Sequence, residues 1–290
     1  MRLGCIDIGS NTTRLLVADC DDQQLDSIHQ ERSFTRLGHE LFEHGTIRPA
    51  KIAEVVNVVR DQRDVAARLG ATAVHAVATE ALRSAANGSA LVAAIDDATG
   101  LSVEVLSQAE EARLAFVGAT GTLREPTSER LGVVDVGGGS SELVVGEAPN
   151  QVQWWASVPL GSGRLTRRHL FTDPPTEGEL SSARTQIAAE LEGLDVPRPS
   201  AVVAVGGSAT SLSRVAGPVL SPRVLAQALM LLGAERSTKI AIDYGIDSER
   251  ARLLPAGLLI LGQVAGLFRA PLVVGHGGIR EGVLLEASST

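Results

Sequence analysis

The sequence has few cysteines and few aromatic residues, and each scarcity excludes a class of protein. Its two cysteines, Cys5 and Cys20, lie in or beside apolar runs without metal-ligand spacing. We therefore expect buried, reduced thiols and a cytoplasmic protein rather than a disulfide framework. Only 3% of the residues are aromatic, whereas glycine, alanine, valine and leucine are abundant. That balance is typical of α/β layers rather than of a disordered or membrane protein.

Long apolar runs, a basic charge balance and a Walker A motif are also missing. The N-terminal apolar run is cut after a few residues by Asp7, so we expect no signal peptide. Residues 253–268 are the most apolar segment, but they are too few to cross a bilayer and include Pro255, which predicts a buried core helix. A net charge of −8 disfavours a general nucleic-acid binder. Without a Walker A motif the chain is not a P-loop enzyme.

The chain is long enough for two domains. With 290 residues it can form two domains that each bury a sizeable core. The stretch 118–130 is rich in glycine, threonine, proline and serine, which indicates a connection between domains. We therefore predict an N-terminal domain over residues 1–124 and a C-terminal domain over residues 125–290.

The second domain is predicted to begin with a glycine turn flanked by two carboxylates. In LGVVDVGGGSSELVVG, residues 131–146, a β-branched run leads into three glycines and a second apolar run follows. This pattern predicts a strand, a phosphate-sized turn and a second strand. Asp135 precedes the turn and Glu142 follows it, and their oxygens suit a hard divalent cation. An ordinary glycine-rich turn between solvated acids is the alternative.

The pattern recurs twice, which favours a ligand site over an ordinary turn. Near the N-terminus an apolar run ends in Asp7, turns through glycine and polar residues, and resumes. After residue 202, AVVAVGGSATSLS again combines a strand, a glycine turn and the start of a helix. Three such turns imply two related halves that face one anionic ligand. The candidate phosphate-binding residues are Gly9, Ser10, Asn11, Thr12, Gly137, Gly138, Gly139, Ser140, Gly206, Gly207, Ser208 and Thr210.

These loops resemble the two phosphate loops and the nucleotide loop of the actin, hexokinase and chaperone ATPase superfamily. Within it, the chain resembles the exopolyphosphatase and guanosine pentaphosphate phosphohydrolase (Ppx/GppA) family over essentially its whole length, through DIGSNTTRLL, ATEALRSA, SQAEEARLAF, DVGGGSSELVVG, PLGSGRLTRR, LLPAGLLIL and GIREGVL. The resemblance implies an α/β fold of two ribonuclease H-like (actin-like ATPase) domains with an interdomain cleft. It also implies a last helix that can pack back on the first domain.

Three features depart from the family pattern. Gln108 stands where the family commonly has glycine, and Ala209 stands where the third loop usually has another glycine. Both departures can reshape loops near phosphate. The sequence also ends without the helical extension of longer members, which implies a preference for short polyphosphates or a nucleotide.

Arg83 is the predicted cationic contact to phosphate. Thr79 can cap a helix that has Arg83 in its first turns. Helix amides and a guanidinium together offer positive potential to one anion. The family's Ala-Leu-Arg motif supports this assignment. A surface arginine paired with Glu80 is the alternative.

Glu111 is the predicted general base. Ser107 and Glu110 have the spacing of a capping box, whereas the side chain of Glu111 points about 100° further around the helix. By resemblance, Glu111 matches the glutamate that activates the attacking water. From the residue alone, a solvated acid on a helix face remains the alternative. Arg113 is placed to pair with either carboxylate.

Two basic segments are further candidates for substrate contact. The first comprises Arg32, Arg36 and His39, in a region where the family has a basic loop; a solvated loop explains them equally well. The second comprises Arg164, Arg167, Arg168 and His169, which either bind distal phosphates of a polyanion or cover a helix face. His276 is near the last loop, where an isolated histidine is more often structural.

The predicted reaction is release of a terminal phosphate from inorganic polyphosphate or from a nucleotide such as guanosine pentaphosphate. Asp135 and Glu142 would hold Mg²⁺ (or Mn²⁺), assisted by Asp7, while the loops and Arg83 bear the developing charge. We expect no nucleic-acid or membrane partner, and a homodimer is left open. A non-catalytic phosphate or nucleotide sensor is the main alternative, disfavoured by retention of Glu111, Asp135 and Glu142. A sugar or acid kinase is disfavoured by the EEAR and ATEALR segments.

Overall fold

The computed structural model describes residues 1–21, 24–123 and 129–289 and divides into two units. Unit 1 comprises Met1–Thr122 together with Gly277–Thr290, and unit 2 comprises Leu123–His276. The C-terminal segment thus belongs with the N-terminal part of the chain. The predicted boundary between residues 124 and 125 lies outside the described residues.

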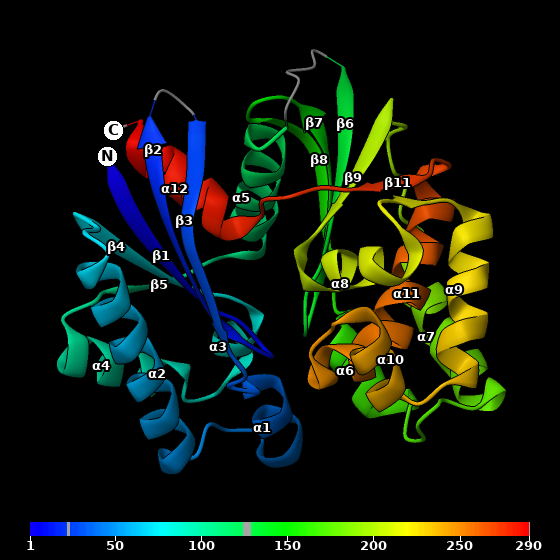
Figure 1. Cartoon of the computed structure of the whole chain (residues 1–290), viewed down its shortest axis with the longest axis horizontal. Coiled ribbons are helices and arrows are strands. Elements are labelled where there is room, and N and C mark those ends of the chain that lie inside the picture. The colour runs from blue at the N-terminus through cyan, green and yellow to red at the C-terminus, as the bar shows by residue number, and fades with distance from the viewer. Residues whose placement is uncertain (22–23, 124–128, 290) are drawn as a thin grey trace. The chain divides into compact units, whose positions relative to one another are not determined.

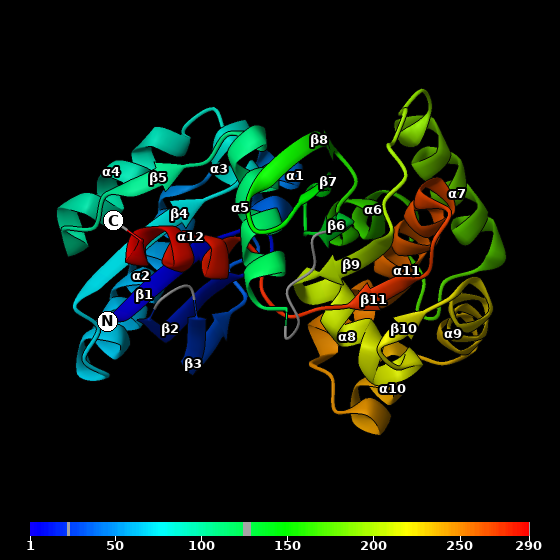
Figure 2. The ribbon, with the colours of Figure 1, turned by 90° about the horizontal axis from the view of Figure 1, so that it is seen from above.

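Unit 1 is a five-stranded sheet with helices on both faces, in the order β3-β2-β1-β4-β5 (Figure 1). Its strands are β1 (Arg2–Ile8), β2 (Thr13–Asp21), β3 (Gln24–Ser33), β4 (Ala73–Ala78) and β5 (Val103–Val105). Its helices are α1 (Leu37–His44), α2 (Pro49–Arg68), α3 (Glu80–Ser84), α4 (Gly88–Thr99), α5 (Gln108–Gly121) and α12 (Ile279–Ser288). Figure 2 shows α12 beside α5, and the two helices pack together.

Side-chain alternation in β1 separates the two layers of unit 1. Ile6 and Ile8 pack into the cluster that contains residues of α2 and α4. Leu3 and Cys5 pack on the other face with residues of α5 and α12. Because successive side chains of a strand point to opposite faces, Asp7 lies on the α5 and α12 face, like Cys5. Cys5 and Cys20 are buried free thiols, and burial raises the pKa of both.

Unit 2 is a six-stranded sheet in the order β10-β11-β9-β6-β7-β8. Its strands are β6 (Arg130–Val136), β7 (Ser141–Glu147), β8 (Gln151–Val158), β9 (Ala201–Val205), β10 (Val219–Leu220) and β11 (Leu272–Val274). Its helices are α6 (Ser162–His169), α7 (Glu177–Leu191), α8 (Gly206–Ala216), α9 (Pro222–Ala234), α10 (Ser237–Tyr244) and α11 (Ser248–Phe268). By length and composition alone, helix α11 could cross a membrane. It is largely buried in the core of unit 2, which agrees with the predicted core helix.

The two units repeat one topology. In each, a strand pairs antiparallel with the next strand of the chain and parallel with a later one that runs into a helix: β1 with β2 and β4, and β6 with β7 and β9. The registers match as well, because Asp7 lies opposite Val77 and Asp135 lies opposite Val205. The expectation of α/β architecture with two related halves is confirmed.

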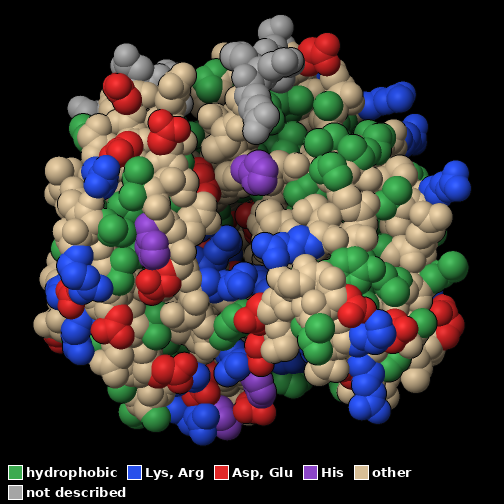
Figure 3. All heavy atoms as spheres, in the orientation of Figure 1, with side chains coloured by type: hydrophobic (Ala, Val, Ile, Leu, Met, Phe, Trp, Pro, Cys, Tyr) green, Lys and Arg blue, Asp and Glu red, His purple; other side chains and the backbone are tan. Residues whose placement is uncertain are grey.

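One edge strand of the unit 2 sheet, β10, is short. Val219 and Val273 pair across β10 and β11 and are 48% and 44% exposed. Figure 3 shows hydrophobic side chains gathered over β9 and β11 on the visible face. A two-residue edge strand offers little unpaired backbone to other chains, whereas β8 at the opposite edge has eight residues.

Candidate functional site

The first two predicted loops are closed by the same hydrogen bond. In loop 1 (Gly9–Thr12), the amide of Gly9 donates to the carbonyl of Thr12 at 3.0 Å. In loop 2 (Gly137–Ser140), the amide of Gly137 donates to the carbonyl of Ser140, also at 3.0 Å. Each turn therefore has the same length and closure, so the resemblance between the two sequence patterns extends to their conformation.

The carbonyl groups of loop 1 are held by the start of α1. The amide of Gly38 donates to the carbonyl of Ser10 at 2.6 Å, and the amide of Arg36 donates to the carbonyl of Asn11 at 3.0 Å. In a trans peptide the N–H points opposite to the C=O. The N–H groups of Asn11 and Thr12 are therefore directed away from α1, which is the orientation an anion cradle needs.

Loop 2 is held in the same way by the start of α6. The amides of Ser162 and Arg164 donate to the carbonyls of Gly137 and Gly138, each at 2.9 Å. The same peptide geometry directs the N–H groups of Gly138 and Gly139 away from α6. Both loops thus present amides on one side because a helix start binds their carbonyls on the other.

Gly161 is a residue of this arrangement that the sequence interpretation missed. A Cβ atom at Gly161 would collide with the backbone of Gly138 and Gly139. Only glycine lets α6 come close enough to bind the loop 2 carbonyls. The signal in the sequence was the glycine pair of PLGSGRLTRR, which was used for the family resemblance and not for a contact.

Loop 3 (Gly206–Ser208) joins β9 to α8 and contacts the end of the neighbouring strand β6. Gly206 has φ 81°, and a Cβ there would collide with Oδ1 of Asp135, so glycine is required twice over. Ser208 Oγ donates to the carbonyl of Val136 at 3.1 Å. Thr210 donates its hydroxyl hydrogen to the carbonyl of Gly206 at 2.9 Å, which uses that donor within its own helix.

Arg250 of α11 is the second residue that sequence reasoning missed. A Cβ at Gly207 would lie 2.5 Å from Cζ of Arg250, so the guanidinium lies directly against loop 3. Arg250 is 8% exposed. It was overlooked because 43 residues separate it from Gly207 and no local pattern joins them. Ala209, the predicted departure in this loop, is fully buried in the apolar core of unit 2.

Asp135 and Glu142 are a fitting donor set for a divalent cation. They lie directly opposite one another on β6 and β7, where like charges repel. Ser157 Oγ donates to Oε1 of Glu142 at 3.0 Å, which orients that carboxylate. Among the described residues, no three or more His, Cys, Asp and Glu side chains group as a metal site. Water and phosphate oxygens would complete the shell, as is usual for Mg²⁺; the assignment stays a prediction.

Asp7 has a different environment from its counterpart Asp135. Its partner across β1 and β2 is Arg14, a cation in place of a carboxylate. Burial raises the pKa of Asp7 and Glu281 adds to the rise, while Arg14 and Arg280 oppose it. Within the described part of the chain, Oδ1 of Asp7 and Nδ2 of Asn11 are buried without a hydrogen-bond partner. An acceptor and a donor left open at loop 1 fit a hydrated cation and an anion.

Arg83 and Glu111 form an ion pair within unit 1. Nη1 of Arg83 donates to Oε1 of Glu111 and, at 2.6 Å, to the carbonyl of Leu106. Glu111 is 2% exposed, so it is not a solvated acid on a helix face. Glu80, the alternative partner of Arg83, accepts a hydrogen bond from Ser10. Because 26% of the Arg83 side chain is exposed, it can contact a ligand while it holds Glu111.

Helix α5 is fixed by contacts on both sides of Glu111. Ser107 Oγ accepts from the amide of Glu110 at 3.2 Å, as the capping-box spacing predicted. The carboxylate of Glu110 binds Arg113 at 2.8 Å, and this hydrogen bond lowers the pKa of Glu110. Arg113 also binds Glu286 of α12 at 2.8 Å. Glu110 is thus a structural residue. Its carboxylate binds Arg113 instead of returning to the backbone N–H of Ser107, as a full capping box requires.

The first basic segment divides between β3 and α1. Arg32 is exposed, with its guanidinium 5.2 Å from the ring centroid of Phe34. Arg36 has φ 50° and begins α1 beside loop 1, with an exposed side chain. His39 is exposed on α1, and its Nδ1 lies 3.5 Å from Oε2 of Glu43. Of the three, Arg36 contacts a phosphate loop directly, because its amide binds the carbonyl of Asn11.

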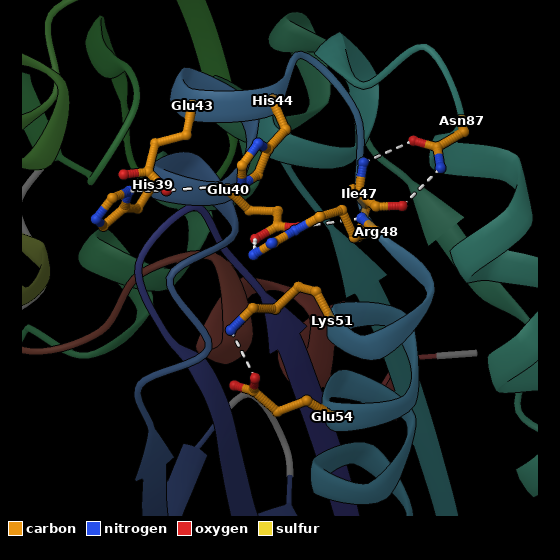
Figure 4. A network of polar contacts seen from close by, with 9 residues as sticks. All are labelled: His39, Glu40, Glu43, His44, Ile47, Arg48, Lys51, Glu54 and Asn87. Atoms are coloured by element: carbon orange, nitrogen blue, oxygen red, sulfur yellow. Dashed lines mark hydrogen bonds and ion pairs between the residues drawn. The ribbon is translucent and has the colours of Figure 1, made fainter.

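Helix α1 is held in place by the polar network in Figure 4. The buried Glu40 accepts three hydrogen bonds from Arg48, whose Nε lies 2.7 Å from Oε1. Asn87 binds both backbone groups of Ile47, at 2.9 and 2.8 Å. Because α1 holds the loop 1 carbonyls, this network supports the cradle indirectly.

The second basic segment forms α6 and is only partly exposed. Arg168 is exposed, whereas Arg164 and Arg167 are half-buried. Nδ1 of His169 lies 2.9 Å from Ser182 Oγ, and burial, helped by Arg168, lowers the pKa of His169. His276 is exposed. Contact with distal phosphates stays a prediction, best carried by Arg168.

Sequence comparisons assign the chain to a family. The Ppx/GppA phosphatase family matches residues 16–290, and the chain belongs to this family. Exopolyphosphatase 2 of Mycobacterium tuberculosis is 36% identical over 228 residues, which cover 74% of this chain and 70% of that protein. Exopolyphosphatase 1 of Mycobacterium bovis is 29% identical, with 99% of this chain and 88% of that protein covered.

Solved structures agree with the family assignment. The Ppx/GppA family member of Aquifex aeolicus has a TM-score of 0.84 at 29% identity and covers 100% of this chain and 98% of its own. An exopolyphosphatase of Cytophaga hutchinsonii has a TM-score of 0.88 at 23% identity, covering 99% and 98%, which is a likeness of fold. The expected fold of two actin-like ATPase domains is confirmed.

Proposed function

We propose that this member of the Ppx/GppA phosphatase family hydrolyses the terminal phosphoryl group of inorganic polyphosphate. One observation carries the proposal: amides at the starts of α1 and α6 donate hydrogen bonds to the carbonyls of loops 1 and 2, so that other amides of these loops point to the opposite side. Backbone amides aimed to one side suit the oxygens of an anion such as phosphate. The names of the exopolyphosphatase relatives agree with this substrate.

In the proposed reaction, a water oxygen attacks the terminal phosphorus while the bridging P–O bond to the rest of the chain breaks. Glu111 takes the proton of the water, and orthophosphate and a polyphosphate shorter by one unit leave. Arg83, next to Glu111, offers charge-assisted hydrogen bonds to the transferred group. Positioning and charge neutralisation supply most of the rate in phosphoryl transfer, and the residues described here are of those types.

Asp135 and Glu142 would hold Mg²⁺ (or Mn²⁺), which supplies positive charge to phosphate oxygens when bound. Two observations support this assignment. Asp135 and Glu142 are directly paired across β6 and β7, and Ser157 donates a hydrogen bond that orients Glu142. Arg250 adds a fixed cation beside loop 3.

The test is a phosphate-release assay with long polyphosphate, short polyphosphates and guanosine pentaphosphate, each with and without Mg²⁺. We expect Mg²⁺-dependent release from polyphosphate, and the guanosine arm decides whether the nucleotide is also a substrate. Binding of these compounds without release would favour a phosphate or nucleotide sensor.

A further inference from the structure

Helix α3 presents a carboxylate to loop 1. Ser10 Oγ donates a hydrogen bond of 2.9 Å to Oε2 of Glu80. Ser10 is 7% exposed, so this bond is made largely out of water. While Glu80 is ionised, the hydroxyl hydrogen of the loop is used by a carboxylate and not by a ligand.

The repeated topology gives Glu80 of unit 1 a counterpart in unit 2, at the residue that bonds the end of β6 just before loop 2. The strands that pair with Asp7 and Asp135 continue into α3 and α8, and the third residue after each paired valine is Glu80 in unit 1 and Ser208 in unit 2. In unit 2 the side chain at this position is a neutral donor that binds the carbonyl of Val136. In unit 1 it is an acidic acceptor.

This exchange of a hydroxyl for a carboxylate changes what loop 1 can hold. Glu80 is half-buried, and a carboxylate near bound phosphate repels it. The same carboxylate removes a donor that Ser10 would otherwise offer. Arg83, on the same helix, is directed to Glu111 and Leu106. Loop 1 therefore combines amides that attract an anion with an acid that limits how tightly it is held.

We propose that Glu80 is a specificity-determining residue that weakens the hold of loop 1 on free orthophosphate and so favours release of that product. The inference rests on the proposed function, because it treats orthophosphate as the product. A polyphosphate has further phosphate groups to compensate for the repulsion, whereas orthophosphate has none. Glu80 thereby discriminates between substrate and product.

The test is the affinity of the full chain for inorganic phosphate, measured by calorimetry and by product inhibition of polyphosphate hydrolysis. Glu80→Gln removes the charge, and its amide can donate to Ser10 Oγ and release the hydroxyl hydrogen. We expect orthophosphate to bind roughly 3- to 30-fold more tightly. Glu80→Ala, which removes the charge without adding an amide, should change the affinity in the same direction. Adding Ser10→Ala to Glu80→Gln should cancel part of the gain.

The matched control is Glu110→Gln, which removes one negative charge from unit 1 at a residue that binds Arg113. It should leave orthophosphate affinity within about twofold of the wild type. Folded Glu80 variants with unchanged or weaker orthophosphate affinity would overturn the inference while normal hydrolysis left the proposed function standing. A wild type that hydrolyses no polyphosphate, with tighter orthophosphate binding in Glu80→Gln, would overturn the proposed function alone and keep the effect of Glu80 on loop 1.

Discussion

Nη1 of Arg83 donates to the carboxylate of Glu111 and to the carbonyl of Leu106, so one guanidinium nitrogen links the predicted base to the backbone that precedes its helix. Sequence reasoning placed Arg83 and Glu111 in the mechanism separately. The structure makes them one coupled pair. We expect a bound phosphate to draw on Arg83 and to weaken its hold on Glu111, and a carboxylate less engaged by a cation is a stronger base.

The first prediction is that Arg83 and Glu111 are not independent. Arg83→Ala should lower kcat/KM by roughly 10²- to 10³-fold, because it removes a charge-assisted contact, and Arg83→Lys should restore only part, because lysine lacks the planar fork. The loss in an Arg83→Ala, Glu111→Gln double variant should be much smaller than the product of the single losses. Kinetics of the four proteins check this, and strictly multiplicative losses would show that the pair is not coupled in catalysis.

The second prediction concerns the facing carboxylates. Asp135→Asn and Glu142→Gln should each raise the Mg²⁺ concentration for half-maximal activity by roughly tenfold, since each removes a full charge from a cation site. Glu147→Gln, at the end of the same strand β7, is the control and should titrate like the wild type. Metal titrations of activity measure the effect. Wild-type metal response in both variants would remove Asp135 and Glu142 from the metal assignment.

The third prediction tests the contact between Gly207 and Arg250. Gly207→Ala places a methyl group where the guanidinium lies, so Arg250 must move and kcat/KM should fall roughly 10-fold or more. Gly262→Ala, in α11 where a Cβ would meet nothing within 4 Å, is the control and should keep full activity. Wild-type kinetics for Gly207→Ala would mean that the position of Arg250 is unimportant.

The fourth prediction is a pH dependence of stability at α1. Hydrogen bonds from Arg48 lower the pKa of Glu40 from 4.5 to about 2, so the pair stabilises the fold fully above pH 4.5 and loses its effect as the pH falls toward 2. Arg48 is 57% exposed, so solvent screening reduces the contribution to roughly 1–2 kcal/mol. Glu40→Gln should lower the free energy of unfolding by that amount at pH 7.

Urea unfolding of the wild type and Glu40→Gln at pH 7 and at pH 3 measures this difference. The gap between the two proteins should narrow at the lower pH. Glu43→Gln, at an exposed position of the same helix, is the control. A gap that stays constant between the two pH values would contradict the assigned pKa of Glu40.

Patterns within one hairpin were predictable from the sequence. The apolar runs around Asp7 and Asp135 fix two antiparallel pairs, and a short glycine turn brings Glu142 opposite Asp135. Capping was predictable only in part. The carboxylate of Glu110 binds Arg113, because a guanidinium one turn along the helix competes with the backbone for it.

Contacts across long sequence separations were not predictable. Nothing local indicates that the amides after Gly161 bind loop 2, or that Arg250 lies against Gly207. The pairing of Glu80 with Ser10 is of the same kind, since the two residues are 70 positions apart in the sequence. These contacts depend on where β4, β8 and β9 end in their sheets, which only the assembled topology determines.

The central claim is that Glu111 takes the proton from water, and its neighbour on α5 supplies the control. Glu111→Gln keeps size and hydrogen bonding but abolishes basicity, which costs typically about 10²- to 10⁴-fold in rate. Glu110→Gln loses an ion pair with Arg113 at a partly exposed position and should keep most of the activity. Both substitutions remove one negative charge, so charge alone cannot explain a difference between them.

The decisive measurement is single-turnover hydrolysis of polyphosphate by the wild type, Glu110→Gln and Glu111→Gln, together with the affinity of each protein for the substrate. We predict a rate loss of at least about 100-fold in Glu111→Gln alone, with substrate binding retained or tightened. Near-normal turnover by Glu111→Gln would contradict the central claim, because it would show that Glu111 is not the base that takes the proton from water.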